Sequence, residues 1–202
     1  MYNKIPLYYQ FQDFEPLLSS VNLEIHYDYL YDKYVVALNE IFIDNNLEFK
    51  PIEEVLSNLN MYDQSIRDDI NRYGGGYYNH TLFFNSIIPP DYAQTFDYTA
   101  LDSMIDQQFS SKAKFELELR KKLSEVFGSG YTFLIVSEDN NLEIINTINQ
   151  NNPLTIGLKP LLAFDMWEHS FYLDYPVEKS EYINILIDSI NYKFGNYNLE
   201  KK

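Results

Sequence analysis

Cysteine is absent from this chain of 202 residues, which excludes disulfides, zinc-thiolate sites, iron–sulfur clusters and cysteine nucleophiles. Long apolar runs are also absent, since no stretch approaches the length of about 18 apolar residues that is typical of a membrane-spanning helix. The N-terminal segment MYNKIPLYYQFQDF carries polar residues where a signal peptide needs an apolar core. We therefore expect a soluble intracellular protein, cytoplasmic by default.

Positive charge is scarce. The chain has 15 Lys and Arg against 30 Asp and Glu, which gives a formal net charge of −15. Because no basic run appears either, we expect neither nucleic acid nor an anionic membrane surface as a partner. Apolar residues, in contrast, make up 46% of the chain, which is enough for the core of one compact domain or two small ones.

The first half of the chain shows helical periodicity in two stretches. The first begins at Ser19 or Ser20 as N-cap, and its apolar face comprises Leu23, His26, Leu30, Tyr34, Ala37 and Ile41. The second ends before Pro89 and Pro90, and its face comprises Ile66, Ile70, Tyr73, Tyr77, His80, Phe84 and Ile87. Three glycines, residues 74–76, interrupt the second pattern; they indicate either a close backbone approach or a loop between two shorter helices.

The second half has a different character. Residues 100–111 and 111–128 are expected to be helical, with Gly128 ending the second helix. The β-branched runs 131–137 and 142–148 flank a turn-rich EDNN and predict a hairpin, residues 160–165 a third strand, and residues 178–202 a final helix. The expected fold is α+β, in which an N-terminal antiparallel α-hairpin precedes a C-terminal α/β domain with a three-stranded antiparallel sheet.

The chain has only three histidines. His26 and His80 each fall in an apolar helical stripe, and either one alone fits a hydrogen-bonded core histidine better than a metal ligand. The third, His169, follows four residues after Asp165, which ends an apolar strand. Three imidazoles and one carboxylate would suit Fe, Mn or Zn.

Five separated motifs resemble those of the iron/manganese superoxide dismutases. The most specific is LLAFDMWEHSFYLDY, residues 161–175, where the only tryptophan of the chain lies between an aspartate and a histidine. The others, in the same order as in the family, are LEIHYDYLYDKYVVALN, GGGYYNHTLFF, FGSGYTFLIV and INTINQNNPL. The resemblance covers roughly residues 6 to 196.

The resemblance implies a metal site between an N-terminal helical hairpin domain, residues 1–92, and a C-terminal α/β domain, residues 93–202. It implies that the metal ligands are His26, His80, Asp165 and His169. One Mn per subunit, with Fe possible, would cycle between M(III) and M(II) and convert superoxide to dioxygen and hydrogen peroxide.

The resemblance also implies roles around the metal. Tyr34 matches the tyrosine at the mouth of the substrate channel, Gln150 matches the glutamine that hydrogen-bonds the metal-bound solvent, and Trp167 walls the site. Glu168 and Tyr172 match residues of a dimer interface, which implies a homodimer and leaves a tetramer open. With Gly76 in the helix and Gln150 between the strands, the pairing is that of manganese-type members, and we expect Gly76 to leave space for the Gln150 amide.

Several positions depart from the family pattern. Leu30 replaces a histidine, Tyr29 replaces a lysine, and Lys179 replaces an arginine of the substrate funnel. Tyr131, Phe133 and Phe84 stand where tryptophans are usual. These departures keep a second hypothesis open, a metal-binding dimeric relative with little turnover, beside the leading one of an active superoxide dismutase. A third, a helical protein whose histidines are ordinary core residues, requires three coincidences of placement.

Overall fold

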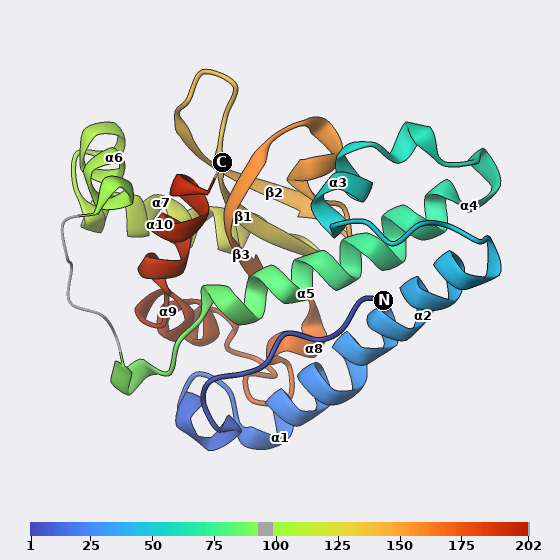
Figure 1. Cartoon of the computed structure of the whole chain (residues 1–202). Helices are drawn as coiled ribbons and strands as arrows, with labels where there is room; N and C mark the ends of the chain where they lie inside the picture. The colour runs from blue at the N-terminus through green and yellow to red at the C-terminus, as the bar shows by residue number, and fades with distance from the viewer. Residues whose placement is uncertain (93–98, 202) are drawn as a thin grey trace.

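A computed structural model describes residues 1–92 and 99–201. An N-terminal helical hairpin is followed by a second set of helices around a three-stranded sheet (Figure 1). The helices of the first part are α1 (Ser20–Glu24), α2 (Asp32–Asp44), α3 (Ile52–Ser57), α4 (Gln64–Asp69) and α5 (Gly75–Ser86). Those of the second part are α6 (Ala100–Phe109), α7 (Lys112–Glu125), α8 (Glu168–Phe171), α9 (Lys179–Asp188) and α10 (Tyr192–Glu200).

The sheet has the order β2-β1-β3, and both pairings are antiparallel. Its strands are β1 (Gly130–Val136), β2 (Leu142–Ile148) and β3 (Lys159–Asp165). Strand β1 is buried from Gly130 to Ile135 because it lies in the middle of the sheet. The predicted α+β fold, with its helical hairpin and three-stranded antiparallel sheet, is confirmed.

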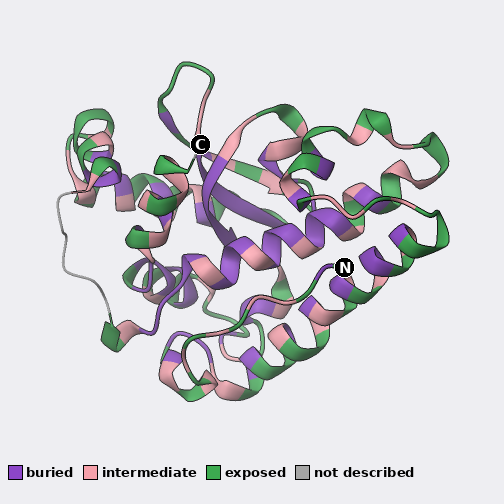
Figure 2. Cartoon of the chain, in the orientation of Figure 1, coloured by how far each residue is buried: buried purple, intermediate pink, exposed green. Residues whose placement is uncertain are grey.

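Helix α5 connects the two halves of the molecule. It crosses in front of the sheet, packs against β3 and lies antiparallel to the long helix formed by α1 and α2 (Figure 1). Figure 2 shows α5 buried along almost its whole length, whereas α2 exposes its outer face. A helix covered on almost every side buries polar residues as well as apolar ones, and α5 buries Asn79 and His80 together with Phe83. Its side chains can therefore point into the space between the two halves.

Both hairpin helices contain a π-helical segment. The segment η2 (Ile25–Tyr31) joins α1 to α2, and η4 (Ile70–Gly74) joins α4 to α5, so that each pair forms one continuous helix. The helix therefore continues through the three glycines, and the alternative of a loop at this place is wrong.

The π segment also displaces the predicted apolar face of the first helix. Leu23 and His26 are buried as expected, but Leu30, Tyr34, Ala37 and Ile41 are only partly buried. The buried residues beyond His26 lie one position later in the sequence: Tyr31, Val35, Leu38 and Phe42. The step from His26 to Tyr31 is five residues, as expected for a π turn with its i to i+5 hydrogen bonds.

Other sequence predictions need correction. The final helix is two helices, because Ser189 to Asn191 pair with the end of α5: the Asn191 amide donates to the Ser86 carbonyl at 2.8 Å, and the Asn191 side chain caps α10. Helix α7 ends at Glu125 and not at Gly128, which has a φ of 74° in the turn before β1. Helices α3 and α8 were not predicted.

None of the helices within residues 1–92 and 99–201 is long and apolar enough to cross a lipid bilayer.

Candidate metal centre

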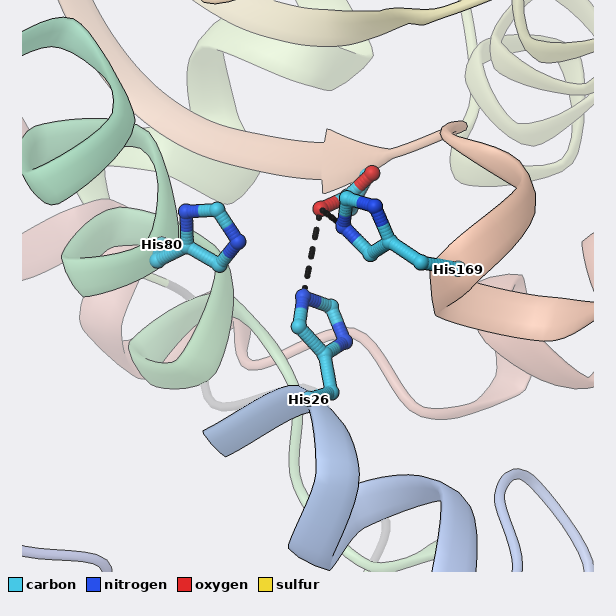
Figure 3. A group of neighbouring side chains, drawn as sticks. His26, His80 and His169 are labelled. Atoms are coloured by element: carbon cyan, nitrogen blue, oxygen red, sulfur yellow. Dashed lines mark ion pairs between the residues drawn. The ribbon is translucent and has the colours of Figure 1, made fainter. Parts of the chain in front are cut away.

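Four side chains from four different elements meet between the hairpin and the sheet. His26 comes from η2, His80 from α5, Asp165 from the last position of β3, and His169 from α8. One potential ligand atom from each lies within 4.8 Å of all the others. Figure 3 shows the three imidazole rings converging from three sides on one point.

The converging atoms have no hydrogen-bond partners. Among the described residues, Asp165 Oδ2 and the Nε2 atoms of all three histidines are buried without one. Asp165 Oδ2 lies 3.4 Å from both His26 Nε2 and His169 Nε2 (Figure 3). Since such atoms are costly to bury unpaired, four of them around one point are explained by a cation that accepts all four lone pairs. The donor set fits Mn, Fe or Zn.

Neighbouring contacts fix the orientation of two donors. His80 Nδ1 lies 2.6 Å from the Gly76 carbonyl oxygen one turn earlier in α5. Because a carbonyl only accepts, the ring proton is on Nδ1, and Nε2 keeps its lone pair for a metal. Asp165 Oδ1 accepts the Trp167 backbone N–H at 2.9 Å, which turns Oδ2 toward the histidines.

The electrostatic environment favours neutral imidazoles and a charged carboxylate. Burial lowers the pKa of His26, and it lowers the pKa of His80 to about 3. Burial alone would raise the pKa of the Asp165 carboxyl, but the facing rings of His169 and His26 hold it below its usual range. One negative charge among three neutral nitrogens is the charge state in which such a set binds a metal.

A hydrogen-bonded group of side chains lies beside the four donors. Gln150 Nε2 donates to Tyr34 Oη at 3.0 Å, and Asn79 Nδ2 donates to both oxygens of Gln150, the side-chain one at 3.2 Å and the main-chain one at 3.1 Å. Tyr131 is fully buried, with its hydroxyl 3.5 Å from His80 Nδ1. Burial raises the pKa of Tyr34, so its phenol stays protonated at neutral pH.

Comparison with known proteins identifies the family to which the chain belongs. Residues 1–88 match the α-hairpin domain of the iron/manganese superoxide dismutases, and residues 97–198 match their C-terminal domain. Similar relatives are the Mn/Fe superoxide dismutase 2 proteins of Staphylococcus aureus strains Mu50, N315 and MW2, each 33% identical over 191 residues. The aligned part covers 94% of this chain and 94% of each relative. The chain belongs to the iron/manganese superoxide dismutase family. It is an enzyme of that class.

In this superoxide dismutase Gly75 and Gly76 each allow a close approach of another segment to α5. A Cβ atom at Gly76 would lie 2.2 Å from the Tyr34 ring, whereas one at Gly75 would lie 2.3 Å from the main-chain oxygen of Gln150. The nearest neighbour of position 76 is thus the Tyr34 ring, and the role of Gly76 in leaving space for the Gln150 amide stays a prediction. Gly76 makes room for the Tyr34 ring, and Gly75 makes room for the backbone of Gln150.

The outer side of the site is lined by α1, η2 and α8. A cavity of about 310 Å³ is lined by Asn22, Ile25, Glu168, His169, Tyr172 and Leu173. His169 is the only one of the four donors whose side chain is accessible, at 22%. Tyr172 is exposed at 54%, and the Trp167 ring packs on the His169 ring with centroids 5.4 Å apart. The role of Trp167 as a wall of the site stays a prediction.

The remaining predicted positions lie farther out. Lys179 begins α9, and its ammonium donates to the Val126 carbonyl at 2.8 Å; its role in a substrate funnel stays a prediction. Tyr29 is exposed, and Leu30 is half-buried on η2. Asn79 was not predicted as a site residue, although its position directly before His80 in the GGGYYNHTLFF motif indicates one.

Proposed function

We propose that this superoxide dismutase binds one manganese ion per chain through His26, His80, Asp165 and His169, with iron as the alternative. The observation that carries this proposal is the set of four unpartnered donor atoms within 4.8 Å. The bound metal would supply the one-electron chemistry, alternately oxidising superoxide to dioxygen and reducing it, with two protons, to hydrogen peroxide.

Residues of the chain would set the charge of the metal site and hold a proton close to it. One carboxylate among three neutral imidazoles gives a ligand set with a single negative charge, which is compatible with both M(III) and M(II). The phenol of Tyr34 holds a proton next to the site and is only partly buried, so it connects the buried Gln150 amide with outside water. Gln150, fixed by Asn79 at its oxygen, would orient that proton toward the site.

The preference for manganese rests on the origin of the amide. Gln150 reaches the site from the segment after β2, and position 76 of α5 is a glycine. This is the arrangement that the family resemblance connects with manganese.

Reconstitution tests the proposed metal and ligands together. Apo-protein loaded separately with Mn and Fe should bind one ion per chain, measured by elemental analysis, and the Mn sample should have the higher dismutase activity. Higher activity in the Fe sample would reverse the metal preference. Failure to retain either metal would disprove the four-residue site.

We further propose that the chain forms a homodimer through the surface that carries Glu168 and Tyr172. Its support is the continuity of this exposed surface with His169 and the adjoining cavity. Sedimentation at micromolar concentration should give twice the chain mass of 24.0 kDa. Glu168→Ala should weaken the dimer at least tenfold, whereas Glu118→Ala, which removes another exposed carboxylate from α7, should not. A wild-type protein that sediments as a monomer would contradict this proposal.

We also propose the division of the enzyme into residues 1–92 and 93–202. The two family matches, to residues 1–88 and 97–198, support a boundary in this region. His26 and His80 would then come from the first domain, and Asp165 and His169 from the second. Thermal unfolding followed by calorimetry should show stabilisation of both parts on metal loading; a metal that stabilised only one of them would contradict a site between domains.

A further inference from the structure

Tyr131 places a hydroxyl group where the family usually has an indole. In the register of the sheet, Tyr131 on β1 is the direct partner of Asp165 on β3. Directly opposite residues of an antiparallel pair project to the same face, with their Cβ atoms about 4.5–5.5 Å apart. Both residues are fully buried. Tyr131 and the only carboxylate of the candidate metal centre therefore project from the same face of the sheet into the same buried space.

The neighbours of this hydroxyl restrict where its hydrogen can go. The nearest ring nitrogen, His80 Nδ1, already donates to the Gly76 carbonyl and has no lone pair to accept with. The side-chain oxygen of Gln150 accepts from Asn79 and, as a neutral amide oxygen, is a weaker acceptor than a carboxylate. The Asp165 carboxylate only accepts, and it carries a full negative charge, which makes it the strongest acceptor in this pocket. Burial and then the charge of Asp165 raise the pKa of Tyr131 well above its ordinary value, which is the direction expected of a phenol close to a buried carboxylate.

We propose that Tyr131 is a positioning residue that donates a hydrogen bond to the Asp165 carboxylate and thereby favours the reduced state of the bound metal. The inference rests on the metal site proposed above. A donor on the only anionic ligand withdraws electron density from it, and M(III) depends on that density more than M(II) does.

The hydroxyl also differs from an indole in the hydrogen bonds that it can make. A hydroxyl can donate and accept, whereas an indole N–H only donates. Tyr131 can therefore accept from the second hydrogen of Gln150 Nε2 while it donates to Asp165. The hydrogen bonds would then run in one direction, from Asn79 through Gln150 and Tyr131 to Asp165.

The test is the reduction potential of the metal-loaded protein, measured by spectroelectrochemistry with mediators. Tyr131→Phe removes only the hydroxyl and should raise the affinity for M(III) relative to M(II) about tenfold, which lowers the potential by about 59 mV. The matched control is Tyr182→Phe, because Tyr182 is equally buried and its hydroxyl donates to the same residue, but to the Asp165 main-chain oxygen, at 3.0 Å. Tyr182→Phe should change the affinity for M(III) relative to M(II) less than twofold.

Tyr131→Trp provides a second variant that keeps a donor at this position, and its potential should stay closer to that of the wild type than to that of Tyr131→Phe. A Tyr131→Phe potential no lower than that of Tyr182→Phe would overturn the inference. Metal content is measured on every sample. If the wild type retains no metal, the proposed metal site is disproved. If metal is retained but the reduction potential does not change when the hydroxyl is removed, only the proposed role of Tyr131 is disproved.

Discussion

Replacing His80 with alanine is expected to give a folded protein that no longer retains its metal. His80 supplies one of four donor atoms, and its ring is locked toward the site by the Gly76 carbonyl at 2.6 Å. Loss of a residue that merely orients a ligand costs about 10–100-fold in metal affinity, so loss of the ligand itself should cost more than about 100-fold. Dismutase activity should fall in parallel, because three donors remain around a partly open site.

The measurement is metal per chain after dialysis against a weak chelator, together with activity on the same sample. Asn85→Ala is a suitable control, because it removes a polar side chain from the same helix, one turn beyond the site, and breaks only its bond to the Thr81 carbonyl. It should keep a full complement of metal. His80→Gln tests the same point with less loss of volume. A His80→Ala protein with one ion per chain and normal activity would remove His80 from the ligand set.

Gly75→Ala is expected to destabilise the protein, although alanine is the better helix former. The added Cβ would lie 2.3 Å from the main-chain oxygen of Gln150, which Asn79 holds at 3.1 Å and which therefore has little freedom to move. Overpacking of this kind costs about 1–3 kcal/mol, against which alanine returns at most ~1 kcal/mol of helix propensity. The midpoint of urea unfolding should fall, and activity should fall with the displacement of Gln150.

Gly74→Ala is the matched control for this clash. Its added Cβ would meet the flexible side-chain ends of Ile52 and Leu56 at 3.3 and 3.4 Å. Both variants gain about the same helix propensity, so the difference between their urea unfolding midpoints measures the effect of the contact with Gln150. We expect the Gly74→Ala midpoint to equal or exceed that of the wild type. A Gly75→Ala protein as stable as Gly74→Ala would contradict this prediction, because it would show that the segment around Gln150 can move to accommodate the added methyl group.

The elements that local patterns encode strongly were predictable from the sequence. The strand runs 131–137, 142–148 and 160–165 agree with β1, β2 and β3 to within one residue, because β-branched residues and an EDNN turn define them locally. The break between α9 and α10 was not predictable, since it depends on contacts with Ser86 in a distant helix. The apolar face beyond His26 was displaced for a similar reason, because periodicity assumes a uniform helix and η2 is not one.

The features of the site also fall into those that the sequence predicts and those that depend on tertiary packing. The convergence of His26, His80, Asp165 and His169 was expected from the family motifs, and the structure brings all four together. Which glycine accommodates which side chain depends on how α2 and the segment after β2 approach α5, and no local pattern in the chain encodes that distance. The contact of Asn79 with Gln150 is of the same kind, joining residues 71 positions apart.

The two π-helical segments restrict which changes in chain length the hairpin can tolerate. A π turn amounts to an α-helix with one inserted residue, and here one such insertion contains His26 while the other ends two residues before Gly76. Deleting one residue from η2 would restore a uniform helix and rotate everything on one side of it by about 100° relative to the other. The ligand or the core face would then point away from its partners. A single-residue deletion at this place is thus a far larger change than most substitutions, and lineages that keep the site must keep the length of these turns.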